Sequence, residues 1–265
     1  MLPTFLGIGV QRAATTWLHD CLSEHPDVFV PAEKELSFFN KHFEKGMGWY
    51  EQKFDSRKSQ SAVGEITPTY MHTTPISRIH EFLPNTRIIV ILRDPVDRAY
   101  SAYQLLQEKF NGMSFEEVCE SPRGDLLINW SLYADRLSDV YEVYPAGQIK
   151  VCLYDDISTK PEQVLAEIFQ FIGVDPGFRP EALRKRPNRI IAPKFQRVLE
   201  RYGMGWTIPL VKASPVGNAI RKWSLRDTRS QPVKETNRRD RLRTAFAEDI
   251  SKLEMLIQRD LSSWR

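Results

Sequence analysis

Short apolar runs alternate with amphipathic segments over most of the chain. Strands are predicted at residues 3–10, 62–66, 87–92 and 148–154. The run RIIVIL at 87–92 is apolar on both faces, as in strands covered on both sides. Helical periodicity predicts helices at residues 15–25, 76–83, 97–110, 129–144 and 160–173. This alternation predicts an α/β fold with a central parallel sheet flanked by helices.

The pattern weakens from about Arg179 to Glu235, where basic residues, prolines and glycines accumulate. We expect this stretch to form loops and short helices that cover the core. A last amphipathic helix is predicted at residues 238–264. At 265 residues the chain is short enough for one α/β domain, so a single domain over residues 1–265 is expected.

Composition narrows the classes of function. The formal charge of +3 is small, so we expect no nucleic-acid partner and only local recognition of anions. Cys21, Cys119 and Cys152 lie far apart in apolar segments, which favours neither disulfides nor a metal site. No apolar run is long enough to cross a bilayer. We therefore expect a cytoplasmic protein with no membrane span, and its oligomeric state stays open.

The turn GVQRAATTWL at residues 9–18 joins the first strand to the first helix. It combines the guanidinium of Arg12, the hydroxyls of Thr15 and Thr16 and the unpaired N–H groups of a helix amino end. This combination predicts a phosphate site. The turn lacks the Gly-Lys-Ser/Thr ending that binds terminal phosphates and magnesium, which disfavours an ordinary P-loop NTPase.

Two further segments are predicted to reach the same place. In ILRDPVDRAYSAY a buried strand carries Arg93 to its carboxyl end, and the next helix carries Ser101. Ligands of open α/β sheets bind at such ends, so these residues predict a second anion site near the first. Two phosphate sites imply a nucleotide phosphorylated at two places. In PAEKELSFFN, Lys34 and Glu35 precede an aromatic pair.

Together these motifs resemble the sulfotransferases that use 3′-phosphoadenosine 5′-phosphosulfate (PAPS), especially bacterial and glycan-type members. GVQRAATTWL resembles the family's 5′-phosphosulfate loop, ILRDPVDRAYSAY its 3′-phosphate strand and helix, and KELSFF its Lys-Glu-x-x-Phe-Phe segment. FAEDISKLEMLIQRDLSSW is similar to the usual C-terminal helix, so the resemblance covers nearly the whole chain. It implies a P-loop-like nucleotide-binding fold, PAPS as co-substrate and no metal.

The resemblance also implies a role for each motif residue. The donor's phosphosulfate would be held by Arg12, Ala13, Ala14, Thr15 and Thr16, its adenine by Trp17, and its 3′-phosphate by Arg93 and Ser101. A late basic loop would add a 3′-phosphate contact from Arg186, Arg189 or Arg229. This chain differs from the family at Arg12, where lysine is the most frequent residue, and at Ala13 and Ala14, where glycines are usual.

The chemistry accounts for these residue types. Sulfuryl transfer resembles phosphoryl transfer in its loose transition state, with charge gathering on the bridging oxygen, so fixed cations and positioning should dominate catalysis. Arg12 is expected to stabilise the leaving charge and Lys34 to orient or neutralise the sulfate. Glu35 is expected to be the general base. Glu65, Thr67 and Tyr70, with His42 and His72, are candidates for the acceptor pocket, and a histidine base is the alternative to Glu35.

The acceptor is not specified by the sequence, because carbohydrates, lipids and small metabolites all present hydroxyl groups, and amines are a less expected acceptor. Two other classes of function stay open. One is a P-loop-like nucleotide kinase, which the missing lysine loop disfavours. The other is a non-catalytic protein that binds 3′-phosphoadenosine nucleotides.

Overall fold

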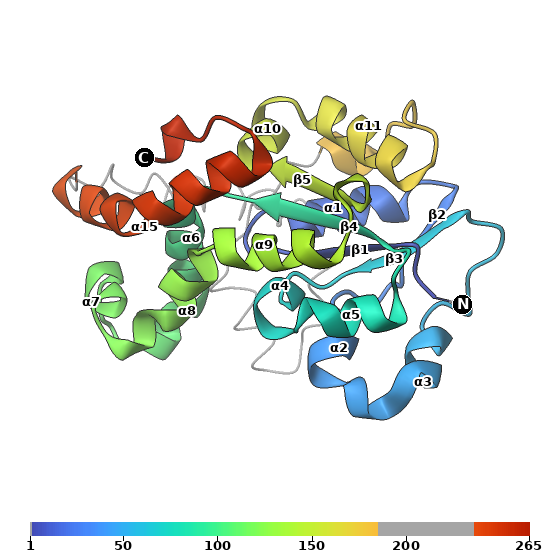
Figure 1. The fold of residues 1–265 in the computed structure, drawn as a ribbon, viewed down its shortest axis with the longest axis horizontal. Helices are drawn as coiled ribbons and strands as arrows, with labels where there is room; N and C mark the ends of the chain where they lie inside the picture. Colours follow the sequence, from blue (N-terminus) through green and yellow to red (C-terminus); the bar gives the residue numbers. More distant parts are fainter. Residues whose placement is uncertain (1, 185–235) are drawn as a thin grey trace, which may run out of the picture. The chain divides into compact units, whose positions relative to one another are not determined.

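A parallel five-stranded sheet forms the centre of the molecule (Figure 1). The structure is a computed structural model that describes residues 2–184 and 236–265, with side chains of the second range from residue 242. The strand order is β2-β3-β1-β4-β5. The strands are β1 (Phe5–Gly9), β2 (Val28–Phe29), β3 (Ala62–Ile66), β4 (Arg87–Leu92) and β5 (Ile149–Leu153).

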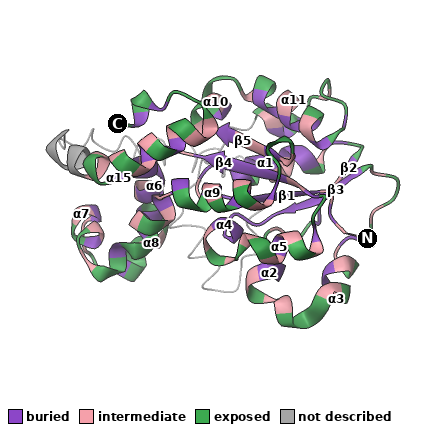
Figure 2. Cartoon of the chain, viewed as in Figure 1, coloured by how far each residue is buried: buried purple, intermediate pink, exposed green. Residues whose placement is uncertain are grey.

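Helices connect and cover the strands. They are α1 (Thr15–Ser23), α2 (Phe38–Lys41), α3 (Gly46–Gln52), α4 (Tyr70–Thr73), α5 (Ile76–Phe82), α6 (Pro95–Leu106), α7 (Phe115–Cys119), α8 (Asp125–Ile128), α9 (Ala134–Val143), α10 (Tyr154–Thr159), α11 (Pro161–Ile172) and α15 (Thr236–Ile257). In Figure 1, α5 and α9 lie side by side in front of the sheet and α1 lies behind it. The strands are buried over most of their length, as Figure 2 shows.

Strand β1 lies between β3 and β4, with Phe5 beside Gly64 on one side and Arg87 on the other. All the pairings among the described strands are parallel, so the carboxyl ends of these strands lie at the same end of the sheet. Gly9 ends β1, and a Cβ on it would lie 2.7 Å from the sulfur of Met71 in α4. Glycine therefore lets α4 pack directly against the end of β1.

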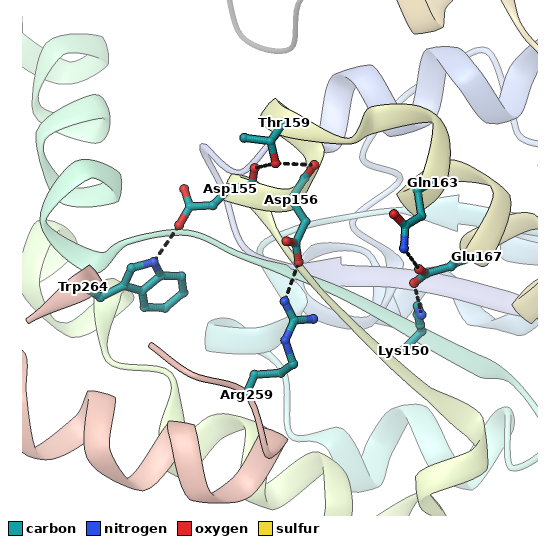
Figure 3. A network of polar contacts seen from close by, with 8 residues as sticks. All are labelled: Lys150, Asp155, Asp156, Thr159, Gln163, Glu167, Arg259 and Trp264. Carbon is teal, nitrogen blue, oxygen red and sulfur yellow. Dashed lines mark hydrogen bonds and ion pairs between the residues drawn. The ribbon is translucent and has the colours of Figure 1, made fainter. Parts of the chain in front are cut away.

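The C-terminal segment is fastened to α10 (Figure 3). Trp264 is 1% exposed, and its indole Nε1 donates to Asp155 Oδ2 at 2.8 Å. Arg259 pairs with Asp156 at 2.8 Å. Residues 2–184 and 239–265 belong to one compact unit.

The expected α/β fold and its four strands are confirmed, and the differences have local causes. The helix expected at 129–144 is a 3₁₀ turn, Asn129–Ser131, followed by α9, because Leu132 is extended. The helix expected at 238–264 ends at Ile257, where Gln258 takes a left-handed φ of 52°. A strand as short as β2 and several one-turn helices carry no periodic signal.

The prediction of one domain stays a prediction, because residues 185–235 lie outside the described residues. Within the described ranges, no helix combines the length and the apolar character that crossing a bilayer would take.

Candidate functional site

The loop between β1 and α1 is tightly folded and buried. Ala13 and Ala14 are fully buried, and Arg12 and Ala14 have φ values of 74° and 64°. A residue with a Cβ is disfavoured in this left-handed region by about 1–2 kcal/mol. Such conformations persist only where surrounding contacts maintain them, and they are common at ligand sites. The expected phosphosulfate loop therefore holds two unfavourable backbone conformations.

The amino end of α1 presents both threonines and meets the Lys-Glu segment. The residue that precedes this helix, Ala14, provides no side-chain cap. The first N–H groups of a helix have no partner within it, so they are donors for a bound group. Lys34 Nζ donates to Thr16 Oγ1 at 2.5 Å and lies 3.8 Å from Glu35 Oε1. Two segments that the sequence treats separately therefore meet at one point.

Glu35 itself stands in an unusual backbone conformation. Its φ is 61°, and Ser37, two residues later, has a φ of 54°. The Glu35 side chain is 39% exposed, so the carboxylate can be reached from solvent, whereas the Lys34 side chain is 21% exposed. Burial lowers the pKa of Lys34, and the neighbouring charges of Glu35 and Asp20 oppose this shift.

Arg93 and Ser101 join the same loop from β4 and α6. Arg12 Nε donates to Ser101 Oγ at 3.0 Å, and Arg93 Nη1 donates to the Arg12 carbonyl at 3.0 Å. Burial lowers the pKa of Arg12, and the charge of Arg93 lowers it further. The fold thus keeps two guanidinium groups close together, an arrangement that favours an anion beside them.

The Arg93 guanidinium is only partly used by the protein. Its Nε is buried and has no hydrogen-bond partner within residues 2–184 and 242–265. Buried donors of native proteins nearly always have partners, so this N–H is a donor that a bound acceptor would satisfy. The ring of Tyr154 lies 4.5 Å from the guanidinium, and Tyr133 Oη donates to the Arg93 carbonyl at 3.0 Å. A phosphate oxygen fits this donor set.

Trp17 lies on α1 and is 4% exposed. Its indole Nε1 is likewise buried without a partner in the described ranges. Its predicted contact with adenine is not tested and stays a prediction. The three late arginines proposed for the 3′-phosphate, Arg186, Arg189 and Arg229, lie outside the described residues.

Three candidates for the acceptor pocket lie in the interior. Glu65 is 2% exposed, Thr67 is fully buried and Tyr70 is 1% exposed. Glu65 accepts hydrogen bonds from Thr67 Oγ1 at 2.6 Å and from Tyr70 Oη at 2.8 Å. The polar atoms of these three residues contact one another, and Tyr70 also lines a cavity of about 510 Å³. Their role in acceptor binding stays a prediction.

The two candidate histidines pack against different tryptophans. The His42 ring packs 5.4 Å from Trp49, near the end of α2. His72 stacks on Trp130 at 5.4 Å and lines a cavity of about 510 Å³ that Arg136 also lines. Burial lowers the pKa of His72 to about 3, and Arg98 and Arg136 contribute. His72 is therefore neutral at physiological pH.

Arg98 contacts the loop after β1, and the sequence assigned it no role. It is 2% exposed, donates to the carbonyls of Gln11 at 3.4 Å and Leu126 at 3.0 Å, and so ties the loop after β1 to α8. Burial lowers its pKa to about 10. Its position in DRAYSAY, one helical turn before Ser101, was the available signal, because both residues then share a helix face.

Across the described part of the chain, no group of three or more potential metal ligands is present. The loop after β1 has no lysine in the position that a Walker loop requires.

Comparison with known proteins identifies the family. The sulfotransferase domain matches residues 3–247. The mouse heparan sulfate glucosamine 3-O-sulfotransferase 3B1 is 33% identical over 182 residues, which are 65% of this chain and 46% of that protein. The human bifunctional heparan sulfate N-deacetylase/N-sulfotransferase 2 is 31% identical over 199 residues, 66% of this chain and 22% of that protein. The chain thus spans less than half the length of these relatives.

A solved structure agrees with these matches. The sulfotransferase from Alicyclobacillus acidocaldarius superposes with a TM-score of 0.71 at 25% identity, and the match covers 100% of this chain and 99% of that one. The expected sulfotransferase fold, with its P-loop-like strand, loop and helix, is thereby confirmed. The chain belongs to the sulfotransferase family.

Proposed function

We propose that this chain transfers the sulfuryl group of PAPS to a hydroxyl group of a carbohydrate, lipid or small-metabolite acceptor. The observation that carries the proposal is the meeting of Lys34 and Glu35 with Thr16 at the amino end of α1. A carboxylate that solvent can reach stands there beside donors suited to an anion. A kinase would need metal and lysine contacts of another kind.

The donor is proposed to lie along the loop after β1. The loop Arg12–Ala14 and the N–H groups of Thr15 and Thr16 would hold the 5′-phosphosulfate, and Arg93 with Ser101 the 3′-phosphate. The unpartnered Nε of Arg93 supports this assignment. Bound there, PAPS supplies an activated sulfuryl group whose leaving group is a phosphate.

The chain's own residues would then divide the chemistry. Glu35 takes the proton of the acceptor hydroxyl while the oxygen of that hydroxyl attacks sulfur. The bond from sulfur to the phosphate oxygen of PAPS then breaks, and PAP leaves. Arg12 stabilises the charge that gathers on the leaving oxygen. Lys34, fixed between Thr16 and Glu35, neutralises charge on the sulfate.

Similarity to enzymes of heparan sulfate favours a carbohydrate among the possible acceptors. The mouse relative is named for O-sulfation of glucosamine and the human one for N-sulfation, so hydroxyl and amino groups are both chemically accessible to this family. We propose a hydroxyl acceptor because a carboxylate base suits a group that must lose its proton during attack.

Labelled sulfate tests the proposal directly. Radiolabelled PAPS is incubated with glycan, lipid and metabolite acceptors, and the chain should transfer label without added magnesium. Glu35→Gln should lower turnover roughly 10²-fold while 3′-phosphoadenosine 5′-phosphate (PAP) binds as in the wild type, because the lost step is deprotonation.

Control variants identify the alternatives. If Glu35→Gln stays active while His42→Ala or His72→Ala is inactive, the base is a histidine. Binding of PAP without transfer to any acceptor would instead support a non-catalytic nucleotide-binding protein, and magnesium-dependent phosphoryl transfer would support a kinase.

A further inference from the structure

The interior carboxylate of Glu65 lies at the centre of hydroxyl groups that reach the Lys34–Glu35 segment. Glu65 is the next-to-last residue of β3, at the carboxyl end of the sheet, where the candidate site is formed. Its Oε1 accepts from Tyr50 Oη and Tyr70 Oη, each at 2.8 Å, and its Oε2 accepts from Thr67 Oγ1 at 2.6 Å. A carboxylate has about four lone-pair positions, so it can accept all three hydrogen bonds.

Two of these hydroxyls have a second partner. Thr67 Oγ1 accepts the backbone N–H of Ser37 at 3.4 Å, and Tyr70 Oη accepts the backbone N–H of Phe39 at 3.4 Å. Each hydroxyl thus gives its proton to the carboxylate and offers its oxygen to the backbone. A hydroxyl that donates to a carboxylate is polarised and becomes a stronger acceptor. This polarisation strengthens the two 3.4 Å hydrogen bonds from the backbone N–H groups.

These hydrogen bonds hold a segment, residues 36–39, whose backbone conformation is unfavourable. Glu35 and Ser37 are both left-handed, and a residue with a Cβ leaves that region unless contacts hold it there. Glu35 precedes the two anchored N–H groups by two and four residues. Anchoring Ser37 and Phe39 therefore restricts where the Glu35 carboxylate can lie relative to Lys34 and Thr16.

We propose that Glu65 is a positioning residue for sulfuryl transfer, which holds residues 36–39 through Thr67 and Tyr70 and thereby places Glu35. This inference rests on the proposed function, since Glu35 is the group that it positions. Burial raises the pKa of Glu65, whereas hydrogen bonds from Thr67, Tyr50, Tyr70 and the Leu36 backbone lower it. These donors match the ionised form, which accepts and does not donate.

Tyr50 supplies the matched control. It donates to the same carboxylate oxygen as Tyr70, at the same 2.8 Å, and both rings are buried. Only Tyr70 also accepts a backbone N–H of the 36–39 segment. Tyr70→Phe and Tyr50→Phe therefore remove equivalent bonds to Glu65, but only the first removes an anchor.

Two measurements on the full-length chain test the proposal. In hydrogen exchange read by mass spectrometry, Tyr70→Phe should speed exchange of amides 36–39 roughly tenfold, and Tyr50→Phe should leave it within about twofold. In sulfuryl transfer, Tyr70→Phe should lower kcat roughly tenfold with the KM for PAPS nearly unchanged, and Tyr50→Phe should stay close to wild type. Thr67→Val should behave like Tyr70→Phe, and Thr67→Ser should restore wild-type behaviour.

The outcomes separate the two proposals. Equal effects of the two tyrosine variants, or faster exchange at 36–39 with unchanged kcat, would overturn the positioning role. If the wild-type chain transfers no sulfate, the proposed function fails, and the exchange rates alone then decide whether Glu65 anchors the segment. Glu65→Gln, which replaces one acceptor oxygen by a donor, should reproduce Tyr70→Phe if it folds.

Discussion

Several residues of the candidate site have backbone conformations that those residue types do not prefer. Arg12, Ala14, Glu35 and Ser37 all have positive φ without being glycine. The first two lie in the loop after β1, and the other two belong to the segment that carries the proposed base. Stability at these positions is therefore lower than an alternative residue could provide, and this is a common property of sites maintained for function.

Glu35 allows this conflict to be measured. Glu35→Gly and Glu35→Ala both remove the half-exposed carboxylate, but only glycine adopts φ of 61° without strain. The glycine variant should have a free energy of unfolding about 1 kcal/mol higher than that of the alanine variant. Glycine avoids the cost of the left-handed conformation, and the greater entropy that glycine loses on folding offsets part of this gain. Urea unfolding of both variants measures the difference. A glycine variant no more stable than the alanine variant would contradict the left-handed conformation.

Arg93 should govern recognition of the donor. PAP should raise the melting temperature of the wild type, and ATP, which lacks the 3′-phosphate, should raise it little, because the shift reports affinity for the folded state. Arg93→Ala should abolish most of the PAP shift. Thermal unfolding with each nucleotide measures this. Arg87→Ala is the control, since Arg87 lies at the opposite end of the same strand and donates to the Ile172 carbonyl. A full PAP shift in Arg93→Ala would remove the 3′-phosphate assignment.

Among the elements, α9 depends on a helix that follows it by more than a hundred residues. Asp249 of α15 accepts the N–H groups of Tyr133 at 2.9 Å and Ala134 at 3.0 Å, where α9 begins. It serves as the N-terminal cap that α9 lacks in its own sequence. The hydroxyl of Tyr133 reaches the Arg93 carbonyl, so this cap also fixes a neighbour of the site.

Loss of this cap should be measurable as a loss of stability. Asp249→Ala should lower the free energy of unfolding by about 1–2 kcal/mol, because two N–H groups at the amino end of α9 lose their acceptor. Chemical denaturation measures the change. Glu248→Ala, one residue earlier, removes a carboxylate that pairs only across the surface of α15 with Lys252 and should change stability little. Equal losses in both variants would show that charge on α15, rather than the cap, is responsible.

The difference between signals within one segment and contacts between distant segments explains what could be predicted from the sequence. The strand RIIVIL and the helix that starts at Pro161 carry their own signals, in β-branched residues and in a proline at the first turn. The motif residues Arg12, Lys34 and Arg93 could be chosen from the sequence because their chemistry is local to short segments, and their roles stay predictions. The anchoring by Thr67 and Tyr70 was missed, because a hydroxyl that bridges a carboxylate to another segment's backbone has no sequence pattern. Their position in GEITPTY places them at the carboxyl end of the sheet, but it does not show which segment their hydroxyls contact.

For the molecule as a whole, stability should depend on pH through His72. Its folded pKa is about 3, below the 6.5 of the unfolded chain, so the unfolded state takes up a proton first as the pH falls. Stability should be unaffected by this group above about pH 6.5 and should fall between about pH 6.5 and 3, by about 1–2 kcal/mol at pH 5 relative to pH 8.

Urea unfolding at several pH values tests this. His72→Phe keeps an aromatic ring against Trp130 and cannot titrate, so it should lose less stability on acidification than the wild type. Identical pH dependence of the two proteins would mean that other groups dominate acid unfolding.

The central place of β1 in the sheet has a consequence for synthesis. The buried strand Phe5–Gly9 precedes both of its partners, β3 at residues 62–66 and β4 at residues 87–92, in the chain. A ribosome therefore exposes the strand at the centre of the sheet well before either neighbour exists to pair with it. Long-range parallel pairing is slow, and an unpaired apolar strand is a site for aggregation or chaperone binding. Nascent chains that end before residue 62, and so contain neither neighbour, should be held by chaperones through this strand.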